Sequence, residues 1–140
     1  MTILDTNVVS ELMKSAPSAA VTSWISGQLA DDLYTTTITV AEILYGIELL
    51  PKGKRRDQLL READATFSED FAGRILAFDE ASARFFGAVA AARRSQGRPI
   101  GTFDAQIAAI TRVHGAIVAT RDTGDFEGCG VRIINPWQSS

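Results

Sequence analysis

Acidic side chains stand in this chain of 140 residues where predicted strands end and predicted helices begin. Asp5 directly follows the short apolar run TIL, and Asp122 closely follows the apolar run AIVAT. Glu42 and Asp104 each lie near the start of a segment with helical spacing of apolar residues. Carboxylates gathered at one edge repel one another unless a cation lies between them. An all-oxygen set favours Mg²⁺ or Mn²⁺ over zinc, and such an ion activates water and stabilises charge on a phosphate.

Each of these acids also has a purely structural interpretation. Thr39 and Glu42 have the spacing of a capping box, in which the glutamate binds a backbone N–H at the start of a helix. Asp104 follows Thr102, a residue suited to the N-cap, and would complement the helix dipole. The other two acids suit helix caps or Asx turns. The case for chemistry therefore rests on the set of four acids and not on any one of them.

The elements that must position these acids alternate between strands and helices. Apolar runs rich in β-branched residues predict strands that are buried on both faces; they are Thr2–Leu4, Leu33–Thr36, Ile75–Phe78, Ala116–Thr120 and Val131–Ile134. Helical spacing lies between them, so we expect a single three-layer α/β/α domain over residues 1–140 with a central, mainly parallel sheet. Such sheets place function beyond the carboxyl ends of their strands, which suits three of the four acids. Asp104 lies in the first turn of a helix that itself follows another helix, so strand order alone does not place it.

Composition excludes several classes of protein. Hydrophobic residues make up 46% of the chain and charged residues 22%, as in ordinary globular domains. A net charge of −3 argues against nucleic-acid binding through bulk charge, although a local basic rim is compatible with it. The single Cys129 and the single His114 exclude a disulfide framework and a histidine-rich metal site. No run is long and apolar enough for a membrane span, and the N-terminus lacks the pattern of a signal peptide, so we expect a cytoplasmic protein.

Four blocks of sequence together resemble a known family. They are ILDTNVVSEL, TITVAEILYGIELL, GTFDAQIAAI and the ending ATRDTGDFEG with INPW. In order and spacing these blocks resemble PIN-domain proteins, and most closely the VapC/FitB-like ribonuclease toxins of bacterial toxin–antitoxin pairs. The resemblance covers nearly the whole chain. It implies a PIN-like fold with a parallel sheet between helices, in agreement with the pattern of predicted elements.

The resemblance also implies a set of catalytic residues, which are Asp5, Glu42, Asp104 and Asp122. Asp5, Asp104 and Asp122 would bind Mg²⁺, with Mn²⁺ as a substitute, and Glu42 would be a further ligand or would orient the attacking water. Asp125 competes with Asp122 for the fourth place. Thr6 and Asn7 are candidates for the small polar residue that the family has near its first acid. The implied reaction is metal-dependent cleavage of single-stranded regions of RNA.

Further implied partners are a small antitoxin that has its own DNA-binding domain and a second copy of the chain in a homodimer. Candidate residues for the antitoxin groove are Ala41, Leu44, Tyr45, Leu49 and Leu50. Candidate contacts with RNA phosphates are Arg93, Arg94, Arg98 and Arg121. Arginines near helix ends also complement the helix dipole, so these residues have a structural interpretation as well.

Other functions compete with a toxin ribonuclease. Asp122-Thr123-Gly124 is the triplet that carries the catalytic carboxylate of aspartic proteases. Arg121 before it and the α/β pattern both count against a protease, whose half-site lies in an all-β fold. The alternatives that stay open are a PIN-type nuclease of RNA processing or DNA, and a nucleic-acid-binding or antitoxin-binding module without catalysis. The presence of all four acids argues against the last of these.

Overall fold

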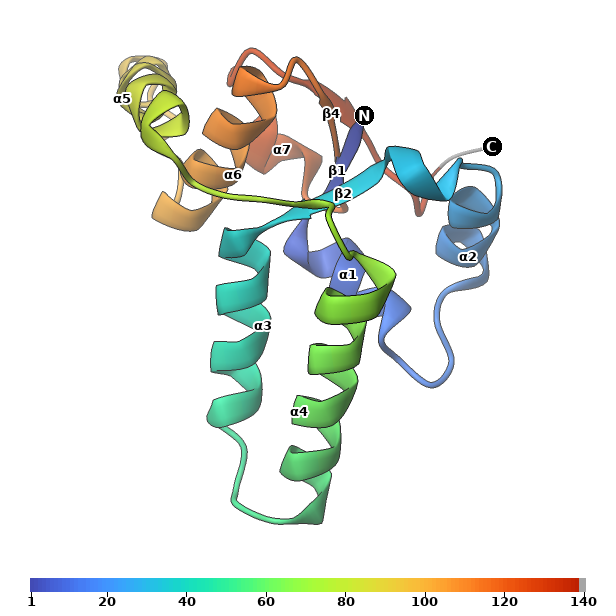
Figure 1. Ribbon diagram of the computed structural model, residues 1–140. Coiled ribbons are helices and arrows are strands. Elements are labelled where there is room, and N and C mark those ends of the chain that lie inside the picture. The colour runs from blue at the N-terminus through green and yellow to red at the C-terminus, as the bar shows by residue number, and fades with distance from the viewer. Residues whose placement is uncertain (139–140) are drawn as a thin grey trace.

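A five-stranded sheet, parallel throughout, forms the centre of the molecule (Figure 1). In this computed structural model, which describes residues 1–138, the strand order is β3-β2-β1-β4-β5. The strands are β1 (Thr2–Leu4), β2 (Leu33–Thr36), β3 (Ile75–Leu76), β4 (Ile117–Ala119) and β5 (Arg132–Ile134). All five lie within the apolar runs that predicted them, and the expected central parallel sheet is confirmed.

Helices connect the strands and cover both faces of the sheet. They are α1 (Thr6–Leu12), α2 (Ala19–Ser26), α3 (Thr37–Glu48), α4 (Lys54–Ala65), α5 (Glu80–Ser95), α6 (Thr102–Val113) and the short α7 (Thr123–Phe126). Figure 1 shows α5 and α6 on one side of the sheet, α1 on the other, and the α3–α4 pair projecting away from it. The expected three-layer α/β/α arrangement is therefore confirmed.

Alternation along the strands divides the core between the two faces. Ile3 of β1 packs with Ile110 of α6, whereas the next residue, Leu4, packs with Val8 and Val9 of α1. On β4, Val118 belongs to the α6 side and the following alanine to the α1 side. Successive side chains of a strand point to opposite faces, so strands that are apolar throughout require helices on both sides.

The strand order creates a switch point beside β1. The chain passes from β1 to β2 on one side, and it later returns to β4 on the other side of β1. The segments that leave β1 and β4 therefore diverge at the carboxyl edge, where open α/β sheets form their binding crevices. Asp5 follows β1 and Asp122 follows β4, so the two acids flank this crevice.

The α5–α6 hairpin brings a third acid to the same edge. The Arg112 guanidinium near the end of α6 lies 4.9 Å from the ring centre of Phe85 near the start of α5, so the two helices run antiparallel. Helix α5 thus covers the distance back to the carboxyl edge, and α6 begins there with Asp104 in its first turn. The sequence left the position of Asp104 open because this reversal depends on packing between helices.

Candidate active site

Asp5 is the most buried acid of the site. Its side chain is 4% exposed, and Oδ1 accepts a hydrogen bond of 2.8 Å from the backbone N–H of Thr6. Oδ2 accepts one of 2.8 Å from the Thr120 hydroxyl and one of 3.3 Å from Asn7 Nδ2. Burial raises the pKa of Asp5 to about 6 against these hydrogen bonds, with smaller contributions from the carboxylates of Glu42 and Asp122. Asp5 therefore does cap α1, which was its predicted structural role, but capping uses only Oδ1 and leaves Oδ2 for other contacts.

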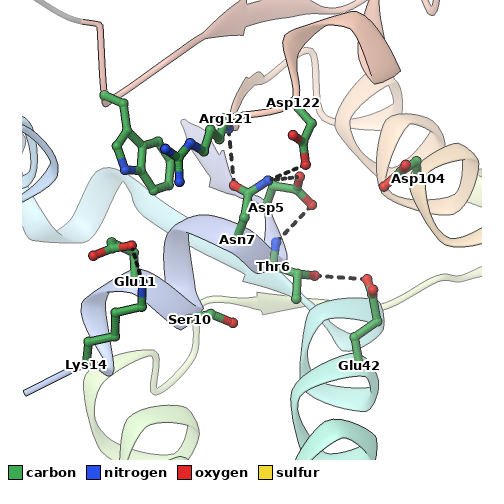
Figure 2. A pocket seen from close by; sticks show the side chains of 11 residues that line it. Asp5, Thr6, Asn7, Ser10, Glu11, Lys14, Glu42, Asp104, Arg121 and Asp122 are labelled. Atoms are coloured by element: carbon green, nitrogen blue, oxygen red, sulfur yellow. Dashed lines mark hydrogen bonds and ion pairs between the residues drawn. The ribbon is translucent and has the colours of Figure 1, made fainter. Parts of the chain in front are cut away.

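Asn7 ties Asp5 to Asp122. Its Nδ2 lies 3.1 Å from Asp122 Oδ2, and its Oδ1 accepts a hydrogen bond of 3.2 Å from the backbone N–H of Arg121 (Figure 2). The Thr120 hydroxyl completes the arrangement by accepting a hydrogen bond of 3.1 Å from the backbone N–H of Asp122. Thr120 was not among the predicted site residues. The signal that could have found it is a polar residue at the end of an apolar strand, directly before the acidic turn.

Thr6, the first residue of α1, links this helix to α3 through its hydroxyl group. Its hydroxyl donates a hydrogen bond of 2.9 Å to Glu42 Oε1 and lies 3.0 Å from the Thr39 hydroxyl. The predicted capping box at this point is wrong. The N-cap of α3 is Thr36, whose hydroxyl accepts a hydrogen bond from the Thr39 backbone N–H, so Glu42 lies one turn further into the helix. Its carboxylate is consequently free of a capping role and turns toward Thr6.

Asp104 differs from the other acids because no residue of the described chain donates a hydrogen bond to its carboxylate. It lies in the first turn of α6, whose N-cap is Gly101 and not the expected Thr102. Burial raises the pKa of Asp104 to about 7, and the carboxylates of Asp5, Asp125, Glu42 and Asp122 add to the shift by repulsion. The Asp104 carboxylate is therefore repelled by these four acids, and no hydrogen bond from a described residue stabilises its charge.

These side chains face one cavity of about 430 Å³ at the carboxyl edge of the sheet. All four predicted acids, Asp5, Glu42, Asp104 and Asp122, contribute to its walls, together with Thr6 and Asn7 (Figure 2). A neighbouring cavity of about 260 Å³ shares Glu42 and Asp104 with it. Asp125 is exposed on α7 and does not line either cavity, although its charge reaches Asp104.

A metal site here requires more than the side chains alone. As these side chains stand, no group of three or more His, Cys, Asp or Glu residues within residues 1–138 is arranged to hold a metal ion. The donors nevertheless fit a hard divalent cation in their chemistry, since all are carboxylate oxygens. Burial, with smaller contributions from repulsion between the carboxylates, raises the pKa of both Asp5 and Asp104, and a nearby cation would offset both effects. Mg²⁺ keeps several of its own waters, so such an ion needs only one or two direct carboxylate ligands.

The sequence of the chain matches the PIN domain family over residues 2–128. This chain belongs to the PIN-domain family. The resemblance read from four sequence blocks is thereby confirmed, as is the fold that it implied. Divalent-metal dependence is general among nucleases of this family.

Two relatives and one solved structure show how far the likeness of this PIN domain extends. VapC ribonuclease Y4jK of Sinorhizobium fredii is 44% identical over 138 residues, which are 99% of this chain and 99% of that protein. Toxin FitB of Neisseria gonorrhoeae is 39% identical over 137 residues, which are 98% of this chain and 99% of that protein. A structure of FitAB bound to an IR36 DNA fragment contains a chain with a TM-score of 0.92 and 38% identity, with coverage of 100% here and 98% there.

Of the four arginines expected to contact RNA, the PIN domain uses one as an internal support. Arg93 is 4% exposed, and its guanidinium donates hydrogen bonds to the carbonyl oxygens of Arg98, Asp125 and Glu127. A further contact of 3.7 Å joins Nη1 to the buried sulfur of Cys129. With Nε and Nη1 engaged in this way and little of the residue exposed, the fold gives Arg93 a structural role, and its contact with RNA stays a prediction.

The other three arginines are exposed. Arg98 forms an ion pair of 3.2 Å with Glu127, and Arg94 lies on the surface at the end of α5. Arg121 lines the acidic cavity. Their roles in RNA binding stay predictions.

The residues expected in an antitoxin groove lie along α3 and just beyond it. Tyr45, Leu49 and Leu50 are exposed apolar side chains, Ala41 is exposed, and Leu44 packs partly against the core. A mainly apolar cavity of about 360 Å³ lies between α1, α3 and α4, and of these five residues it is lined by Leu50. Their contact with an antitoxin stays a prediction. Within residues 1–138, no helix combines the length and hydrophobicity that crossing a membrane requires.

Proposed function

We propose that this PIN domain is an Mg²⁺-dependent endoribonuclease, with Mn²⁺ as a substitute, and that it acts as the toxin of a type II toxin–antitoxin pair. The observation that carries the proposal is the convergence of four carboxylates on one cavity. They come from four places in the chain, after β1, on α3, at the start of α6 and after β4. The names of the relatives, a VapC ribonuclease and a FitB toxin, support the choice of RNA as the substrate and of toxin as the biological role.

In this proposal Asp5, Asp104 and Asp122 hold the cation, and Glu42 orients the attacking water or serves as a further ligand. When bound, the ion would supply an activated water and stabilise the negative charge that builds on the phosphate. The chain supplies positioning. Asn7 keeps Asp5 and Asp122 side by side, and Thr6 holds one oxygen of Glu42 so that the other stays available.

The proposed partners follow from the same relatives. We propose that a small antitoxin with a DNA-binding domain restrains the enzyme, because FitAB was solved as a complex on DNA. A homodimer, and a larger complex with the antitoxin, belong to the same proposal. The proposed RNA substrate would be met in the cytoplasm.

The test compares wild type with Asp104→Asn on a single-stranded RNA in the presence of Mg²⁺. Wild type is expected to cleave and to stop when EDTA is added, whereas the variant should lose activity by about 100-fold because it lacks one carboxylate of the site. Asp64→Asn is the matched control, since Asp64 is exposed on α4 and remote from the cavity. Induced expression in cells should slow growth with wild type and the control but not with Asp104→Asn.

Two results would redirect the proposal. Equal cleavage by wild type and Asp104→Asn would show that the acidic cavity is not the active site. Cleavage of single-stranded DNA without cleavage of RNA would replace the toxin ribonuclease by a PIN-type DNA nuclease.

A further inference from the structure

The cavity has a basic side as well as an acidic one. Within the described chain, Lys14 and Arg121 are the two cationic residues that line it. Figure 2 shows both of them on the side away from Asp104. Carboxylates suit a cation, whereas Lys and Arg suit an anion such as phosphate, so the two sides of the cavity favour different ligand groups.

Arg121 presents its guanidinium on this side, where its charge helps to lower the pKa of Glu11 without forming an ion pair with it. Its backbone N–H is anchored on Asn7 Oδ1, which is itself part of the acidic centre. The guanidinium carbon lies 5.1 Å from the centre of the Trp137 ring, in cation–π geometry. None of the ion pairs among residues 1–138 involves Arg121. Stacking therefore orients the guanidinium while its N–H groups stay available to an anion.

Trp137 is well placed to hold Arg121 still. Its backbone N–H donates a hydrogen bond of 2.9 Å to Asn135 Oδ1, and its side chain packs against the core on the α1 face. The ring also lines the cavity. A ring fixed between core and cavity restricts the rotamers of the arginine that stacks on it, so less entropy is lost when the arginine binds an anion.

Lys14 is held by a buried acid. Glu11 is 7% exposed, and its two oxygens accept hydrogen bonds from Lys14 Nζ and from the backbone N–H of Ser18, each 2.9 Å long. One N–H of the ammonium group is thus used, and two remain for a ligand. The pairing keeps Lys14 beside the cavity although most of its side chain is exposed.

We propose that Arg121, stacked on Trp137, and Lys14 form a subsite for a phosphodiester next to the scissile one in RNA. This inference rests on the proposed function and adds a second phosphate to it. Arginine and lysine side chains bind phosphate oxygens. Being positively charged, they cannot act as ligands for a cation that the acids bind. Arg121 and Trp137 act differently in the subsite: the arginine contacts the phosphate, and the tryptophan is a positioning residue.

The first experiment measures binding without cleavage. A fluorescent single-stranded RNA is titrated with protein in EDTA over a range of salt concentrations, and the slope of log K against log salt is recorded. Each phosphate contact on a single strand contributes about 0.7 to this slope. Arg121→Gln should therefore lower the slope by about 0.7, and Lys14→Gln should lower it by a similar amount. Arg84→Gln is the control, because Arg84 is exposed on α5 and pairs with Glu80 far from the cavity.

The second experiment locates the phosphate. Oligonucleotides that carry one neutral methylphosphonate at successive positions are bound to wild type and to Arg121→Gln. Wild type should lose affinity at one position beside the scissile bond, and the variant should be insensitive to the change at that same position. A wild type that is equally affected at all positions would overturn the subsite.

The third experiment separates the roles of Trp137 and Arg121. Trp137→Phe keeps a ring for stacking and should preserve the salt slope, whereas Trp137→Leu should lower it as Arg121→Gln does. In the Arg121→Gln background, Trp137→Leu should have no further effect on RNA affinity. A further loss in that background would overturn the positioning role, since it would mean that the ring contacts RNA itself. Thermal unfolding of each variant checks that the fold is intact.

These results stand apart from the test of the proposed function. If wild type cleaves RNA with Mg²⁺ but Arg121→Gln and Lys14→Gln keep the wild-type salt slope, the subsite fails and the ribonuclease stands. If the slopes and the methylphosphonate position behave as expected while no RNA is cleaved, the subsite stands and the proposed catalysis fails.

Discussion

Asp5 and Asp104 line the same cavity, but the chain holds them in opposite ways. Asp5 is buried and receives hydrogen bonds from Thr6, Asn7 and Thr120, whereas no described residue donates to the carboxylate of Asp104. The pKa is raised for both, to about 6 and about 7. One half of the site is therefore already in place before any ligand arrives. The other half is an acid whose charge is unfavourable until a cation compensates for it.

Among changes that keep all four acids, the largest effect on activity is expected from breaking the half of the site that is already in place. Asn7→Ala removes the amide that joins Asp5 to Asp122, and with it the acceptor for the Arg121 backbone N–H. We expect kcat/KM on RNA to fall by about 10- to 100-fold, as when supporting residues of metal sites are removed. Ser10→Ala, in the same cavity but without such a link, is the control. An unchanged rate for Asn7→Ala would show that the two acids need no bridge.

Because the pKa of Asp104 is raised, we expect metal binding to depend on pH. Binding a cation at Asp104 requires a carboxylate whose pKa is about 7 without metal, so a proton leaves as the metal binds. The affinity for Mn²⁺ should be roughly fivefold lower at pH 6 than at pH 7 and should level off above pH 8. Calorimetry in two buffers of different ionisation enthalpy counts the protons released. Asp104→Asn should release fewer protons, and equal release by both proteins would contradict this origin.

A smaller effect is expected where Thr6 supports Glu42. Thr6→Val keeps the shape of the side chain but removes the hydrogen bond of 2.9 Å to Glu42 Oε1 and the contact of 3.0 Å with the Thr39 hydroxyl. A net loss of about 1 kcal/mol would lower kcat roughly fivefold. Thr6→Ser, which keeps the hydroxyl, should restore most of the rate in the same assay. If Ser fails to do so, the methyl group and not the hydroxyl is what matters.

The smallest effect concerns stability without metal. Folding raises the pKa of Asp104, so the folded state binds its proton more tightly than the unfolded state does. The associated stability is fully present below about pH 4 and is lost as the pH rises through about 7. Asp104→Asn should therefore raise Tm in EDTA by a few degrees at pH 8 and leave it unchanged near pH 4. Because Asp104 is partly exposed, solvent screening keeps this effect small.

Asp5→Asn offers a contrast within the same measurement. Asp5 accepts hydrogen bonds at both oxygens, so an amide nitrogen there would meet a donor and offset the gain from removing the charge. Its Tm at pH 8 should rise less than that of Asp104→Asn. The opposite order would mean that the cost of burying the charge outweighs the hydrogen bonds to Asp5.

Residues that depend on local pattern were predictable from the sequence. The strands are short apolar runs, and each of Asp5 and Asp122 is placed by the strand before it. Residues that depend on packing were not predictable. The N-cap of α3 is an intermediate case, because the predicted strand already ended at Thr36 but the spacing of Thr39 and Glu42 favoured a later cap. Asp104 reaches the site because of the α5–α6 reversal.

Arg93 shows the same limit for charged residues. An arginine in the last turn of a helix beside a second arginine is typically solvated, and nothing in its neighbourhood marks it as buried. Two of its partners are backbone carbonyls more than 30 residues further along the chain, and backbone acceptors leave no trace in the sequence. The two arginines that differ most in role, Arg93 and Arg121, are therefore alike until the fold is known.

The buried guanidinium of Arg93 has a consequence for the modularity of this domain. The segment ATRDTGDFEG carries Asp122, but the carbonyl oxygens of its Asp125 and of Glu127 depend on an arginine from α5. A graft of this segment onto another α/β scaffold would transfer the acid and leave those carbonyls without their donor. Transferring Asp122 in its native loop therefore requires two segments of the chain, the C-terminal turn of α5 and the loop after β4.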